Sequence, residues 1–137
     1  MDIQAVRDGL ANNADAITDL TALGYAPNDA QPPLFYVGDV DIESIGFGRA
    51  TGREKLTITC RVLTSSADDK TGQQLLAAYL KGSGPTSIIA AIEADKTLGG
   101  KCENLQVVRR SGFRKYPLGS NDYFGAELTV EVLGLGD

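Results

Sequence analysis

The alternation of apolar and polar residues in the segment KLTITCRVLTS, residues 55–65, limits the possible folds more than any other feature of this chain. From Leu56 to Val62 every second residue is apolar, and threonine or arginine lies between them. Successive side chains of a β-strand point to opposite faces of its sheet. The pattern therefore predicts a strand with one buried face and one mostly polar face.

Three further segments have strand character. LFYVGDVDI, residues 34–42, follows two prolines, while NLQVVRRSGF and YFGAELTVEVL occupy residues 104–113 and 123–133. We expect the last two to pair as an antiparallel hairpin, joined by the turn-rich connection RKYPLGSND, residues 114–122. In this interpretation a basic tip that carries Tyr116 projects from the sheet as a contact element. Packing of Tyr116 and Tyr123 at the rim is the alternative.

Apolar residues at spacings of three and four predict three helices. The first stripe has Asp2 as its cap and Gly24 as its stop, and consists of Ile3, Val6, Leu10, Ala14, Ile17 and Leu20. ADDKTGQQLLAAYLKG, residues 67–82, predicts a second helix. Ile88, Ile89 and Ile92 indicate a short third helix before Gly99 and Gly100.

The loop GSGPTS, residues 82–87, has the glycines and hydroxyls of a phosphate-binding loop but not its context. A Walker loop follows a strand and ends in Gly-Lys-Ser/Thr, and a dinucleotide fingerprint needs a third glycine where Ser87 stands. We interpret the loop as a connection between two helices. Gly82 supplies a left-handed stop, Pro85 fits the next first turn, and Gly84, Thr86 or Ser87 caps it.

These elements predict an α+β fold: a mostly antiparallel β-sheet with helices packed on one face, in a single domain over residues 1–137. At 137 residues, with 42% hydrophobic residues, the chain can enclose one core. The glycine-rich residues 43–55 predict a flexible hairpin or loop that a partner orders. Cys60 and Cys102 are too sparse for a disulfide framework, so we expect both to be reduced and structural.

The absence of histidine argues against enzymatic chemistry that depends on an imidazole. It removes the commonest general base and the commonest metal ligand, so no Ser-His-Asp or Cys-His nucleophile can form. We expect no catalytic residues, no cofactor and no metal; a carboxylate-only site at Asp39, Asp41 and Glu43 is the remaining metal possibility. No secretory signal or membrane-spanning run is recognisable, which predicts a cytosolic protein with no membrane partner.

Charge is distributed unevenly along the chain. Residues 1–50 carry eight acids against two arginines, while residues 101–116 carry five basic residues against one acid. A basic hairpin can meet an acidic surface of a neighbouring subunit, although an ordinary solvated hairpin has the same composition. The candidate subunit or partner interface comprises Asp39, Asp41, Glu43, Phe47, Arg109, Arg110, Arg114, Lys115 and Tyr116. Phe47, between two glycines, either enters the core or waits for another subunit.

Taken in order, the elements resemble the tail terminator proteins of long-tailed bacteriophages, which are related in fold to the tail terminator of lambda-like phages. The resemblance covers most of the chain and rests on the succession of elements. Its segments are IQAVRDGLANN, PPLFYVGDV, KLTITCRVLTS, DDKTGQQLLAAYLKGSGPTSIIAAIE and DYFGAELTVEV. Residues 43–55 depart from it, because their length does not align.

The resemblance implies a virion subunit of the tail and neck that is present in the host cytoplasm during assembly. Such subunits form a homo-oligomeric ring, a hexamer, on the end of the tail tube, stop its polymerisation and offer a surface to the head-completion or connector protein. Double-stranded DNA passes through the ring, and the net charge of -5 argues against tight phosphate contact. The alternatives are another neck protein, a small-molecule-binding α+β module and, least of all, an enzyme.

Overall fold

The sheet has the strand order β1-β2-β3-β5-β4, in a computed structural model that describes residues 1–28, 31–45, 52–66, 70–118 and 121–135. Only the short β1 pairs in parallel, with β2, and the other three pairings are antiparallel. The described strands are β1 (Thr21–Leu23), β2 (Leu34–Ile45), β3 (Arg53–Ser66), β4 (Asn104–Leu118) and β5 (Asn121–Leu135). The described helices are α1 (Ile3–Ala14), α2 (Lys70–Tyr79) and α3 (Ile88–Glu93).

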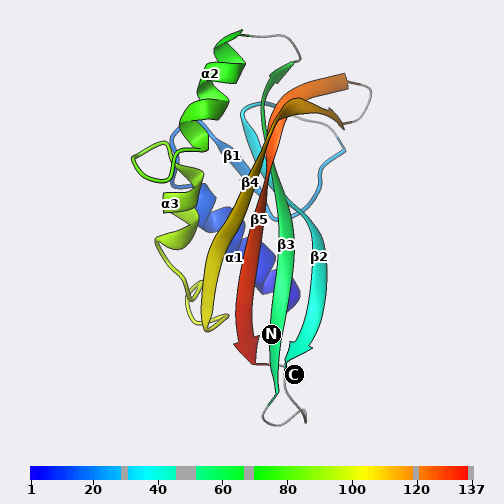
Figure 1. Cartoon of the computed structure of the whole chain (residues 1–137), viewed down its shortest axis with the longest axis vertical. Coiled ribbons are helices and arrows are strands. Elements are labelled where there is room, and N and C mark those ends of the chain that lie inside the picture. The colour runs from blue at the N-terminus through cyan, green and yellow to red at the C-terminus, as the bar shows by residue number, and fades with distance from the viewer. Residues whose placement is uncertain (29–30, 46–51, 67–69, 119–120, 136–137) are drawn as a thin grey trace.

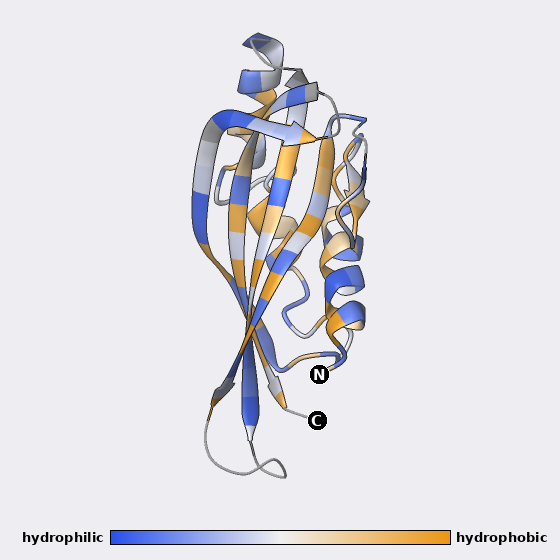
Figure 2. Cartoon of the chain, turned by 90° about the vertical axis from the view of Figure 1, so that its right-hand side faces the viewer, coloured by the Kyte–Doolittle hydropathy of each residue, from blue (hydrophilic) through white to orange (hydrophobic). Residues whose placement is uncertain are grey.

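All three helices lie on one face of the sheet. Figure 2 shows the sheet from the β2 side, with α1 on one side of it, and in Figure 1 α2 and α3 lie beyond β4. The alternating residues of β3 predicted to be buried, Leu56, Ile58, Cys60 and Val62, are all fully buried under these helices. The α+β class, the mostly antiparallel sheet and the one-sided helical layer are thereby confirmed.

The opposite, uncovered face of the sheet carries a second and smaller cluster. Leu34, Tyr36 and Leu63 pack there with Tyr116 and Tyr123. Tyr116 and Tyr123 are only 5% and 7% exposed, so their rim packing is confirmed and a projecting tyrosine-bearing tip is wrong. The reason is that β4 continues to Leu118 and β5 begins at Asn121, so most of the expected connection lies within the strands.

The first helix is shorter than its apolar stripe predicts. It ends at Ala14, and single-turn hydrogen bonds, including Ile17 N–H to the Ala14 carbonyl at 3.1 Å, carry the chain to β1. Ile17 and Leu20 are buried as expected, but from this turn segment. Asp19 has a φ of 66°, in the left-handed region, which a continuing helix does not allow. The stripe therefore identified the core residues correctly and the helix end wrongly.

The loop between α2 and α3 connects two helices, as predicted, but the residues that cap and turn the chain differ in part from those expected. Ser87 is the N-cap of α3, and its hydroxyl accepts a hydrogen bond from the Ala90 N–H at 3.1 Å. Pro85 lies before the helix rather than in its first turn. The left-handed φ, 104°, belongs to Gly84 and not to Gly82, because α2 already ends at Tyr79 and the turn closes later.

Candidate subunit interface on the two sheet edges

At both ends of the strand order, within the residues that the structure describes, the sheet has strand segments with a neighbour on one side only. β1 pairs with Leu34–Tyr36 alone, which leaves residues 38–45 of β2 open; we call these the β2 edge. At the other end of the strand order β4 pairs only with β5, and we call its residues 108–118 the β4 edge. Such edges present unpaired backbone N–H and C=O groups that can template another strand.

Two side chains mark where these edges begin. The Arg7 guanidinium donates from Nη2 to the Val37 carbonyl at 2.9 Å, directly before the β2 edge. The Glu93 carboxylate on α3 accepts from the Val107 N–H at 2.9 Å, directly before the β4 edge. Backbone groups at these two positions are already satisfied within the chain, so a partner strand has only the stretches beyond them to bind.

The β2 edge is acidic. A bulge between Val37 and Val40 takes Asp39 out of the regular register, while Asp41 and Glu43 lie opposite Thr57 and Lys55 of β3. Glu43 is 3.3 Å from the Lys55 ammonium, and this pairing raises the pKa of Lys55. Asp39 and Asp41 form no ion pair within the described residues, and both are exposed. They are the acids on this edge that a partner can engage.

The basic residues of the β4 edge divide between the two faces of the sheet. Arg109 lies opposite Thr129 on the uncovered face, and Arg110 lies opposite the core residue Leu128 on the helical face. Arg114 returns to the uncovered face after a second bulge, and Lys115 follows on the other face. The four residues that the sequence groups as one patch are therefore two pairs.

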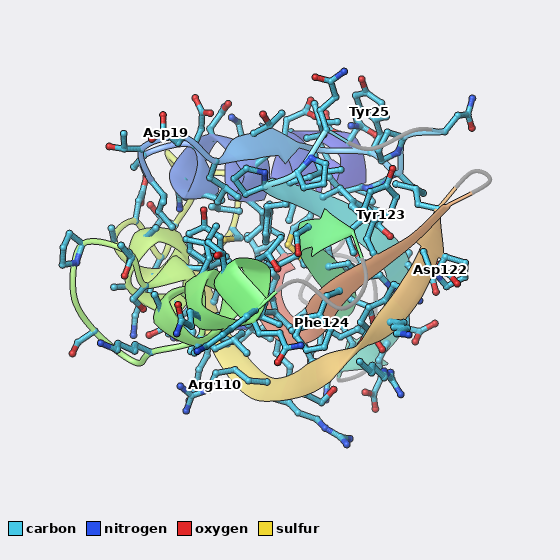
Figure 3. The ribbon with its side chains drawn as sticks, turned by 90° about the horizontal axis from the view of Figure 1, so that it is seen from above. Asp19, Tyr25, Arg110, Asp122, Tyr123 and Phe124 are labelled. Atoms are coloured by element: carbon cyan, nitrogen blue, oxygen red, sulfur yellow. The ribbon has the colours of Figure 1, made fainter. Side chains whose placement is uncertain are left out.

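Arg110 is held beside a groove. Its Nη1 donates to the Leu80 carbonyl at the end of α2, at 2.8 Å, and Figure 3 shows it on the side of β4 nearest α2 and α3. The groove beside it has a volume of about 490 Å³. Its lining residues are Gly82, Ile89, Glu93, Gln106, Val107, Val108, Arg109 and Arg110. It thus combines one arginine from each face of β4, Arg109 and Arg110, with the side chain of Val108, which is 44% exposed.

Arg114 is already occupied within its own chain. It forms an ion pair and hydrogen bond with Glu127, and its Nε donates to the Tyr116 hydroxyl at 2.8 Å. Arg61 lies on the other side, with its Nε 3.8 Å from Glu127, and both guanidinium groups stack about 5 Å from the Tyr116 ring. Burial raises the pKa of Tyr116. Arg114 and Tyr116 therefore stabilise the uncovered face through contacts within their own chain, and the Arg114 side chain remains 62% exposed.

Exposed apolar side chains accompany the charges at the edges. Ile42 and Ile45 on the β2 edge are 51% and 42% exposed, and Leu135 at the end of β5 is 58% exposed. Ile45 and Leu135 both lie opposite Arg53, on either side of it. These residues could not be recognised from the sequence, because only the strand order shows that they lie where the helices do not reach.

The remaining sequence candidates are Phe47, the carboxylates considered as a metal site and the two cysteines. Phe47 lies outside the described residues, with the rest of residues 46–51. The described ends of the glycine-rich segment, 43–45 and 53–55, pair with each other as parts of β2 and β3, so the expectation that only a partner orders them is wrong. In the described ranges no three histidine, cysteine or acidic side chains approach one another closely enough to hold a metal ion. Both cysteines are free and buried, and burial raises the pKa of Cys60 to about 12, so it is a neutral core thiol.

Comparison of the sequence with protein-family models and with curated proteins finds no match. Among the helices that the structure describes, none is both long and apolar enough to cross a membrane. The two edges and the succession of elements are the features of this chain that bear on its function.

Proposed function

We propose that this chain is a structural subunit of a bacteriophage tail, which forms a ring on the head-proximal end of the tail tube, ends tube polymerisation and provides the surface for joining the head. The likeness of its elements to tail terminator proteins supports the biological setting. The observation that best supports assembly into a ring is that the open edges at opposite ends of the sheet bear opposite charge.

Opposite charges on opposite edges favour one type of contact between copies. Two β2 edges repel each other through Asp39 and Asp41, and two β4 edges repel each other through Arg109 and Arg110. A β2 edge and a β4 edge attract. The favoured contact is therefore heterologous, and repeated heterologous contacts close into a ring when their rotation returns to the start.

The test uses tail tubes assembled from the tube protein of the same phage. We expect the protein to bind at one end of each tube, as seen by negative-stain electron microscopy, and to stop further growth when added during polymerisation. Binding to DNA-filled heads without tails, and not to tubes, would instead identify a head-completion or connector protein. Indifference to both would contradict a neck function.

A charge-reversal variant and its control connect this activity to the edges. Arg109→Glu reverses an exposed arginine that makes no hydrogen bond or ion pair within the described part of its chain, whereas Arg110 and Arg114 both have internal roles. We expect Arg109→Glu to lose tube-end rings. Lys70→Glu changes the net charge equally at an exposed position at the start of α2, and should retain them.

A further inference from the structure

We propose that copies of this chain join by main-chain hydrogen bonding, with the β2 edge of one copy added as a further strand beside the β4 edge of the next. This inference rests on the proposed ring and specifies how its subunits meet. Side-chain attraction alone would bring the edges together without continuing the sheet.

Strand directions are suited to this addition. β2 is antiparallel to β3, β3 to β5, and β5 to β4, so β4 runs opposite to β2. A second copy placed beside the first in the plane of the sheet, with its strands in the same orientation, sets its β2 antiparallel to the first copy's β4. The pairings across the sheet set Val40 of β2 level with Val107 of β4, so this copy is also shifted along the strand direction, which brings its β2 edge against residues 108–118. The new pair thereby continues the antiparallel order, and antiparallel pairing is favoured slightly over parallel pairing.

The β4 edge has room for an incoming strand. The groove of about 490 Å³ runs beside Gln106 to Arg110 and is bounded on its other side by Ile89 and Glu93 of α3. Glu93 is the one acid that lines it, and its carboxylate is engaged with the Val107 N–H. An added strand therefore meets the exposed Val108, the two arginines and backbone that β5 leaves open.

The β2 edge has the complementary features. Asp39 and Asp41 carry charge opposite to that of Arg109 and Arg110, and the exposed Ile42 and Ile45 can cover apolar surface on the neighbour as Val108 does on its side. Charges and bulges normally protect an edge strand against pairing. Here the charges disfavour pairing of two β2 edges or of two β4 edges, because each such pair has like charge. They do not disfavour pairing of a β2 edge with a β4 edge, because these carry opposite charge.

Hydrogen exchange of the unmodified protein tests the main-chain contact. In the assembled protein, alone or on tail tubes, the amides in residues 38–45 and 108–118 that point away from β3 and β5 should exchange at least tenfold more slowly than in the dilute monomer, while exposed amides of α2 should not change. An assembly without this protection overturns strand addition and leaves the proposed ring standing. A protein that assembles neither alone nor on tail tubes overturns both strand addition and the proposed ring.

A pair of complementary variants tests which edges meet. Asp39→Lys with Asp41→Lys makes both edges basic, and Val108→Glu with Arg109→Glu makes the start of the β4 edge, residues 108–110, acidic by one charge; all four positions are exposed. Each double variant alone should remain monomeric at concentrations where the natural sequence assembles. An equimolar mixture should assemble again, with the two variants alternating. Failure of the mixture to assemble, when both variants melt within a few degrees of the natural protein, overturns the β2-to-β4 pairing.

Discussion

Glu127→Gln is expected to destabilise the uncovered face of the sheet. Glu127 is the acid between Arg61 and Arg114, and it also accepts from the Tyr116 hydroxyl at 3.3 Å. The amide has nearly the same shape but no charge, so the two guanidinium groups stacked on Tyr116 then face each other without a counter-charge. The perturbation therefore removes charge and leaves the packing almost unchanged.

The size of the effect follows from burial. A hydrogen bond to a charged group contributes about 1.5–3 kcal/mol, and an exposed ion pair contributes about 0–1 kcal/mol. The Glu127 side chain is 19% exposed, between these two situations, so we expect the free energy of unfolding to fall by about 2 kcal/mol. The unfolding entropy of a chain of this length is about 0.3 kcal/mol/K, which makes the fall in Tm about 7 °C.

Thermal and urea unfolding followed by circular dichroism measure this change, and Glu131→Gln is the matched control. Glu131 lies on the same strand and the same face, but it is 38% exposed and its ion pair with Lys55 has a distance of 3.7 Å. We expect the control to melt within about 1 °C of the natural protein, as is typical of an exposed pair. Equal losses in the two variants, or none in either, would refute the reasoning.

Three further substitutions test other parts of the fold. Gly125→Ala should lower the free energy of unfolding by about 3 kcal/mol, because a Cβ there would lie 2.2 Å from the Val62 carbonyl oxygen. Gly82→Ala is the control: the atom nearest to its added Cβ is 3.9 Å away, so thermal unfolding should show almost no change. Asn13→Ala should lower the free energy of unfolding by about 1–2 kcal/mol, since the Asn13 side chain donates to the Ile92 and Asp95 carbonyls at 2.9 and 3.2 Å. Asn12→Ala, at an exposed neighbouring position, should change Tm little. Burial raises the pKa of Cys60 from 9.0 to about 12, so its contribution to stability is present below pH 9 and is lost as pH rises toward 12. In urea unfolding between pH 9.5 and 11, the free energy of unfolding of the natural protein should fall with pH more steeply than that of Cys60→Ala, by about 1.4 kcal/mol per pH unit. Equal pH dependence in the two proteins would contradict a protonated buried thiol.

The strands and the core could be predicted from local pattern, because one-sided burial leaves its period in the sequence. The alternation around Cys60 and the stripe from Ile3 to Leu20 identified residues that are buried. Element ends were less predictable. Asp19 leaves the helical region although the apolar stripe continues past it, and β1 has too few residues to show a period.

The candidate site was only partly predictable, because it depends on which strands become neighbours. The sequence grouped Arg109, Arg110 and Arg114 by charge, but the bulges of β4 and the alternation of faces separate them. It did not show that Arg114 faces Glu127, nor that the acidic and basic strands occupy opposite ends of the sheet. Those relations arise from pairings between residues that are distant in the chain.

The mass of the natural protein in solution, measured by multi-angle light scattering over a range of concentration and salt, tests the central account most directly. The account predicts a closed species near six times the 14.5 kDa monomer, formed alone or on added tail tubes and lost toward 1 M salt, where screening weakens contacts between exposed charges. A protein that stays monomeric in every condition, or a dimer that grows stronger with salt, would contradict it.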